Sequence, residues 1–84
     1  MELLDFYADW CGPCQMLKPT IEEFEKLHPE VTVTRVNIDE EEELAEKYSV
    51  EGIPCLVVLK DGEEVAREVG VLPLRKIEKL ARVR

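Results

Sequence analysis

The hydrophobic pattern of the first half of the chain predicts two strands with a helix between them. Residues 3–8 are almost continuously apolar, which is typical of a strand with both faces covered. Over residues 14–27 the apolar positions recur at spacings of three and four, which predicts a helix that ends at His28. Pro19 lies inside this helix and should remove one backbone hydrogen bond and kink it. The β-branched stretch 31–38 predicts a second strand, parallel to the first because a helix links the two.

The second half of the chain predicts a short helix, a hairpin and a final helix. Asp39 and Glu42 have the spacing of a capping box and indicate where the short helix begins. Residues 55–60 and 63–69 have strand patterns, and the Asp-Gly pair between them is the turn most typical of an antiparallel hairpin. Pro73 fits the first turn of the last helix. The order is β-α-β-α-β-β-α, so we expect an α/β fold with a four-stranded mixed sheet flanked by three helices.

Length and charge limit the classes of function. The chain has 84 residues, and we expect one domain, 1–84. There are 19 Asp and Glu against 11 Lys and Arg, a formal net charge of -8, which argues against a dedicated nucleic-acid or anionic-membrane binder because such proteins carry basic patches. No apolar run approaches the ~20 residues of a membrane span, and the start of the chain lacks the basic and apolar parts of a signal peptide. We therefore expect a cytoplasmic protein.

Cys11 and Cys14 give the strongest chemical signal. Their i, i+3 spacing at the start of the first helix puts both thiols on one face, with Cα atoms within the ~4.4–6.8 Å that a disulfide requires. Cys11 comes first in the turn and should face unpaired backbone N–H groups and the positive end of the helix dipole, which favour a thiolate. Cys14 should be less exposed. This asymmetry predicts that Cys11 attacks a substrate disulfide and that Cys14 then resolves the mixed disulfide.

Asp5 is a carboxylate inside an otherwise apolar strand. Burial without a partner would raise its pKa, and the carboxylate could then accept the proton that Cys14 loses when this thiol becomes a nucleophile. The alternative is an Asp at the edge of a strand that faces solvent. The pattern of the strand alone leaves both interpretations open.

These residues belong to a series of motifs that resembles the thioredoxin family. The matching segments cover nearly the whole chain, in the order Asp5-Phe6-Tyr7-Ala8, Trp10-Cys11-Gly12-Pro13-Cys14, Pro19, Val36-Asn37-Ile38-Asp39, Gly52-Ile53-Pro54 and Gly70. The resemblance implies a thioredoxin fold and a protein-disulfide reductase that needs no bound cofactor. It also implies a protein that acts on disulfide-containing proteins and is recycled by thioredoxin reductase. We expect a monomer.

The same resemblance implies the roles of individual side chains. Cys11 is the nucleophile, Cys14 the resolving thiol and Asp5 the buried proton acceptor. Arg35 occupies the place where thioredoxins often carry a Lys near the buried Asp. Because an Arg holds its charge at any working pH, it should keep Asp5 more ionised than usual.

An apolar rim around the dithiol is implied to dock the substrate. The bond between Ile53 and Pro54 is implied to be cis, which leaves the backbone of Ile53 free to pair with an extended substrate. Trp10 could by itself be a core residue, but its place beside the dithiol favours an exposed docking role. The rim residues are Trp10, Gly12, Pro13, Ile53, Pro54 and Gly70.

Two features depart from the pattern of the family. Common thioredoxins begin with an additional strand and helix, whereas this chain opens on the central strand and is closer in size to glutaredoxin and the small archaeal redoxins. The strand over 31–38 then becomes a sheet edge. Cys55 stands where the family usually has Thr. We expect it to be a small buried residue behind the active site, and the alternative is a third redox thiol.

Composition gives one indication of the source. Gln15, Asn37 and Ser49 are the only residues of their types, while Glu is abundant. This bias is typical of heat-adapted proteins. It suggests a thermophilic origin.

Three other functions are considered for the same residues. The first is a glutaredoxin-like reductase recycled by glutathione, although that family commonly has Pro-Tyr between the cysteines. The second is a redox-inert binding module that uses the same rim. The third is a zinc site, for which Cys11, Cys14, Cys55 and His28 supply the right number of ligands. His28 is instead expected to be a surface residue at the end of its helix.

Overall fold

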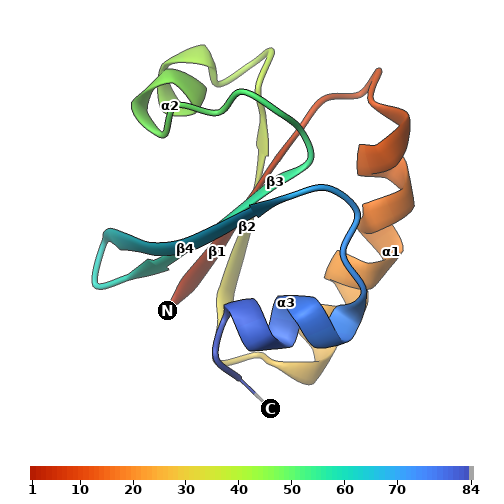
Figure 1. Ribbon diagram of the computed structural model, residues 1–84, viewed down its shortest axis with the longest axis vertical. Coiled ribbons are helices and arrows are strands. Elements are labelled where there is room, and N and C mark those ends of the chain that lie inside the picture. Colours follow the sequence, from red (N-terminus) through yellow and green to blue (C-terminus); the bar gives the residue numbers. More distant parts are fainter. Residues whose placement is uncertain (84) are drawn as a thin grey trace.

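A single mixed sheet with helices on both faces organises the chain (Figure 1). In this computed structural model, which describes residues 1–83, the elements are β1 (Glu2–Tyr7), α1 (Gly12–Leu27), β2 (Thr32–Asn37), α2 (Glu42–Lys47), β3 (Cys55–Lys60), β4 (Glu63–Val69) and α3 (Leu74–Leu80). The strand order is β2-β1-β3-β4, with β1 parallel to β2 and antiparallel to β3. The predicted order of elements, the hairpin of β3 and β4 and the edge position of β2 are confirmed.

Each face of the sheet packs against its own helices. In Figure 1, α1 and α3 lie on one side of the sheet and α2 on the other. Successive side chains of a strand point to opposite faces, so Leu3 of β1 packs under α1 and α3, whereas Leu4 and Phe6 pack under α2. This explains the continuous apolar run of β1. The single break in that run, Asp5, falls on the α1 face.

Helix α1 has the two cysteines at its start. It begins at Gly12, two residues before the predicted start, because Pro13 fits the first turn, where its missing N–H costs no hydrogen bond. The helix then runs unbroken through Pro19 to Leu27. Within residues 1–83, no helix is both long and apolar enough to cross a membrane.

The predicted capping box at the start of α2 is wrong. The helix begins at Glu42 after Glu41, and no side chain caps it. Asn37 instead accepts a hydrogen bond from the backbone N–H of Asp39 at 2.9 Å and holds this segment in a turn. The carboxylate of Asp39 is thereby directed to a different partner, described below.

The prediction that His28 lies on the surface is also wrong. The helix does end there, but the residue is only 4% exposed, because α3 packs across the end of α1. Its Nε2 lies 2.6 Å from Oε2 of Glu78 on α3, and its Nδ1 lies 3.5 Å from Oε2 of Glu30. The ring also packs against Phe24, with 4.9 Å between the ring centroids. His28 therefore joins α1 to α3.

These contacts predict that stability depends on pH through His28. The hydrogen bond to Glu78 raises the pKa of His28, with further help from Glu30, although burial acts in the opposite direction. A pKa raised by folding contributes stability that is complete below the ordinary value of about 6.5 and is lost as the pH rises through the raised value. We expect His28→Gln, which keeps a donor toward Glu78 at every pH, to flatten this decline. Urea unfolding at a series of pH values measures the free energy of unfolding of both proteins. If that free energy declines equally with pH in the two proteins, the prediction is contradicted.

Candidate active site

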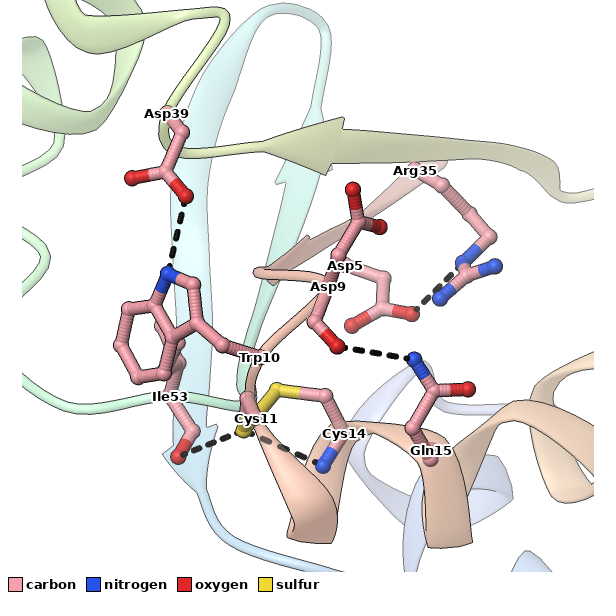
Figure 2. Close-up of a disulfide and its surroundings, with 9 residues drawn as sticks. All are labelled: Asp5, Asp9, Trp10, Cys11, Cys14, Gln15, Arg35, Asp39 and Ile53. Carbon is pink, nitrogen blue, oxygen red and sulfur yellow. Dashed lines mark hydrogen bonds and ion pairs between the residues drawn. A yellow bond between two sulfur atoms is a disulfide. The ribbon is translucent and has the colours of Figure 1, made fainter.

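Cys11 and Cys14 form a disulfide at the start of α1 (Figure 2). Their Cα atoms are 5.3 Å apart, within the range that the spacing predicts. Cys11 is the N-cap of the helix, and its Sγ accepts a hydrogen bond from the backbone N–H of Cys14 at 3.2 Å. Cys11 is 6% exposed and Cys14 is 2% exposed, so the predicted order of exposure is confirmed. Cys11 is therefore the more exposed residue of the pair.

The surroundings of Cys11 favour negative charge on its sulfur. The N–H of Cys14 points at Sγ, and the N-terminus of the 16-residue helix α1 adds the positive end of its dipole. On the other side, the backbone oxygen of Ile53 lies 4.0 Å from Sγ and acts in the opposite direction, because it carries partial negative charge. The N–H of Cys14 and the helix dipole are the two features that would stabilise a thiolate at Cys11, which is the nucleophilic form in disulfide exchange.

Asp5 is buried, so the interpretation of it as a solvent-facing residue is wrong. It is 2% exposed, and its Oδ1 has no hydrogen-bond partner among the described residues. Arg35 donates from Nε to its Oδ2 at 3.3 Å, which confirms the expected proximity (Figure 2). Burial raises the pKa of Asp5, and the charge and hydrogen bond of Arg35 only partly offset this. The carboxyl group can therefore take up a proton at a higher pH than an ordinary Asp.

Trp10 lies on the surface beside the disulfide. It is 70% exposed, and its Nε1 donates to Oδ2 of Asp39 at 2.9 Å (Figure 2). Asn37 binds the backbone N–H of Asp39 and also donates to Asp9 at 3.5 Å. The exposed position predicted for Trp10 is confirmed, but the role of Asp39 was missed. The parallel pairing of β1 and β2 is the signal that points to it, because the carboxyl ends of parallel strands meet at one edge of a sheet.

The loop before β3 faces the disulfide and contains the predicted cis bond between Ile53 and Pro54. The N–H of Gly70 donates to the backbone oxygen of Pro54 at 2.9 Å, and Gly70 has φ +116°, a conformation that other residues rarely adopt. Pro54 itself is buried, whereas Ile53 is half-buried. The exposed part of the predicted rim is therefore formed by Trp10 with Gly12 and Pro13.

The predicted rim does not include two exposed valines beside Gly70. Val69 and Val71 flank Gly70 and are both exposed. A Cβ built on Gly52 would lie 3.2 Å from Val69, which shows that the end of β4 packs closely against the loop before Pro54. The alternation of apolar residues at the end of β4 is the signal that could have identified both valines.

Cys55 is a free and buried residue of β3, as the packing interpretation predicts. It belongs to the cluster beneath α2, and burial raises the pKa of its thiol although Arg67 acts in the opposite direction. The ligands of the zinc alternative are not brought together, because His28 lies at the far end of α1 from Cys11. Among residues 1–83, no three His, Cys, Asp or Glu side chains converge on a point that could hold a metal ion.

Comparison with known proteins gives one consistent family. The family model described as Thioredoxin matches residues 1–82. The protein named thioredoxin from Chlamydia pneumoniae is 52% identical over 69 residues, which are 82% of this chain and 68% of that protein. The thioredoxin of Bacillus subtilis (strain 168) is 43% identical over 79 residues, 93% of this chain and 76% of that protein.

A solved structure gives the same result for the fold. The X-ray structure of Fasciola hepatica thioredoxin superposes with a TM-score of 0.90 at 41% identity, over 99% of this chain and 80% of that one. The predicted fold is confirmed, and the C-x-x-C pair that defines the chemistry stands at disulfide distance. The chain belongs to the thioredoxin family, whose members are protein-disulfide oxidoreductases.

Proposed function

We propose that this protein reduces disulfides in other proteins, with Cys11 as the nucleophile and Cys14 as the resolving thiol. The observation that carries this assignment is the asymmetry of the pair. Cys11 caps the helix and its Sγ accepts a hydrogen bond from the N–H of Cys14, whereas Cys14 is the more buried residue. A nucleophile must be reached by the substrate, and a resolving thiol needs to reach only its neighbour.

The reaction starts from the reduced dithiol. The Cys11 thiolate attacks one sulfur of the substrate disulfide, a bond forms between the two sulfurs, and the second substrate sulfur leaves as a thiolate. Cys14 then loses its proton and attacks the sulfur of Cys11. The bond between Cys11 and the substrate breaks, and the Cys11–Cys14 disulfide forms. The substrate leaves with both sulfurs reduced, having gained the two electrons that the dithiol has lost.

Asp5 is proposed to accept the proton of Cys14. Its strand position on the α1 face of the sheet and the burial of Cys14 on α1 favour this role. Burial raises the pKa of Asp5, so the protonated acid is a less costly product of the transfer than it would be in water.

The substrate is proposed to dock on an apolar rim around Cys11. Trp10, Gly12 and Pro13 offer exposed surface on one side, and on the other the backbone oxygen of the half-buried Ile53 lies 4.0 Å from Sγ of Cys11. An extended substrate segment could pair with that backbone as an added strand. Pro54 and Gly70 shape the loop through their mutual hydrogen bond.

The partner proposed to return the disulfide to the dithiol is a thioredoxin reductase, since the family generally works with that enzyme. The working unit is proposed to be a cytoplasmic monomer whose single domain spans residues 1–84 and which needs no bound cofactor. The formal net charge of -8 supports the monomer by keeping copies apart.

Reduction of insulin by dithiothreitol tests the proposed activity. We expect the protein to accelerate the appearance of turbidity, and a rate equal to that of dithiothreitol alone would contradict the activity. Replacing dithiothreitol by NADPH and a thioredoxin reductase, or by glutathione with its reductase, then identifies the recycling partner. Turnover with glutathione only would contradict the proposed partner.

A further inference from the structure

The guanidinium of Arg35 lies between an acid and an aromatic ring. Its Nε donates to Oδ2 of Asp5 at 3.3 Å, and its Cζ lies 4.1 Å from the centroid of the Tyr7 ring. The Tyr7 side chain also packs against the cluster that contains Cys11 and Cys14. Tyr7 thus contacts both the dithiol region and the cation that faces the buried acid.

Strand pairing explains why these three side chains meet. In the parallel register of β1 and β2, Asp5 stands opposite Arg35. Tyr7 comes two residues after Asp5, so the side chains of both point to the same face of the sheet. The Arg35 side chain can then reach back to Asp5 while its plane covers the ring of Tyr7.

Without the Tyr7 ring, little would hold the Arg35 side chain in its ion pair with Asp5. Arg35 is on the edge strand β2, its side chain is 27% exposed, and it contacts Asp5 through the single hydrogen bond from Nε. A long side chain at such a site loses rotamer entropy when it forms one charged contact, and this loss opposes its attraction to Asp5. A ring face beneath the planar guanidinium supplies additional attraction and fixes the orientation of that plane.

We propose that Tyr7 is a positioning residue whose ring holds the Arg35 guanidinium against Asp5 and so sets how readily that carboxylate takes up a proton. The contact between Tyr7 and Arg35 affects the reaction only through the proposed role of Asp5 in accepting the proton of Cys14. The contact itself does not depend on that role and can be measured separately.

The test compares Tyr7→Leu with the matched control Tyr7→Phe, which keeps the ring face. Besides Arg35 on β2, the thiol of Cys55 on β3 is a titratable group that interacts with the charge of Asp5, and the thiol of Cys14 is the proton donor proposed for Asp5. The oxidised protein is therefore used, in which Cys14 does not titrate. Carbon-13 NMR follows the titration of Asp5, and the exchange rate of the Arg35 Nε–H reports how firmly the guanidinium is held.

Tyr7→Leu should move the titration of Asp5 to higher pH and accelerate exchange at Arg35 Nε about two- to fivefold, the factor that corresponds to a cation–π contact at a partly exposed site. In Tyr7→Phe, the titration of Asp5 and the exchange rate at Arg35 Nε should stay close to those of the unsubstituted protein. In the Arg35→Ala background, Tyr7→Leu should not raise the titration of Asp5 further. Equal shifts in the two backgrounds, or a shift to lower pH in Tyr7→Leu, would overturn the proposal.

A measurement on the unsubstituted protein covers the case in which Tyr7→Leu fails to fold. The ring current of Tyr7 should shift the Cδ protons of Arg35 upfield, and ordinary chemical shifts there would overturn the proposal. If the rate of mixed-disulfide resolution proves independent of Asp5, the proposed role of Asp5 fails, while these NMR measurements still decide the role of Tyr7.

Discussion

Replacing Cys11 by Ser is expected to abolish the reduction of insulin, leaving only the rate of dithiothreitol alone. A hydroxyl has no accessible anionic form at neutral pH, so the favourable surroundings of Sγ at the start of α1 would stabilise nothing that attacks a disulfide. Turbidity at equal protein concentration measures the loss.

Cys55→Ala is the matched control for this loss. Cys55 is free and buried under α2, and a small apolar side chain at its place should preserve most of the activity. If Cys11→Ser keeps its activity, the assignment of the nucleophile is wrong. If Cys55→Ala loses activity while it remains folded, Cys55 takes part in the chemistry as the third redox thiol.

Asp5→Asn is expected to slow resolution of the mixed disulfide by on the order of a hundredfold, a typical contribution of a positioned base, while its formation changes little. Asn keeps the shape of the side chain and an acceptor for Arg35 but cannot take the proton of Cys14. Stopped-flow measurement of the two steps with a disulfide peptide separates them.

The pH dependence of resolution gives a second signature of Asp5. Burial raises the pKa of Asp5, and only its ionised form can accept a proton, so the rate of resolution should fall as the pH decreases through that raised pKa. The Asn variant should lack this step in the profile. Equal slowing of both steps, or an unchanged profile, would remove Asp5 as the proton acceptor.

The sequence predicted most of the fold because its elements carry strong periodic signals. The continuous apolar run of β1 arises from helices on both faces of the sheet, and the Asp-Gly turn between β3 and β4 has the positive φ angles that such a hairpin needs. The dithiol was equally predictable. An i, i+3 pair at the start of a helix has its geometry fixed by the helix itself.

The features that the sequence did not predict depend on contacts between distant segments. His28 is buried because α3, 50 residues later, brings Glu78 to its ring. The spacing of Asp39 and Glu42 is typical of a helix cap, but the pairing of β1 with β2 places Asp39 beside Trp10. Local patterns describe the neighbours of a residue along the chain, whereas these partners are set by the packing of the sheet and helices.

The most direct test of the central claim, that Cys11 attacks and Cys14 resolves, is to identify the cysteine that holds a trapped substrate. Cys14→Ser is mixed with a disulfide peptide, and the mixed disulfide is digested and located by mass spectrometry. We predict a stable adduct on Cys11, because the variant lacks the thiol of Cys14 that resolves the mixed disulfide. An adduct on Cys55, or a comparable yield on Cys14 in the Cys11→Ser variant, would contradict the assignment.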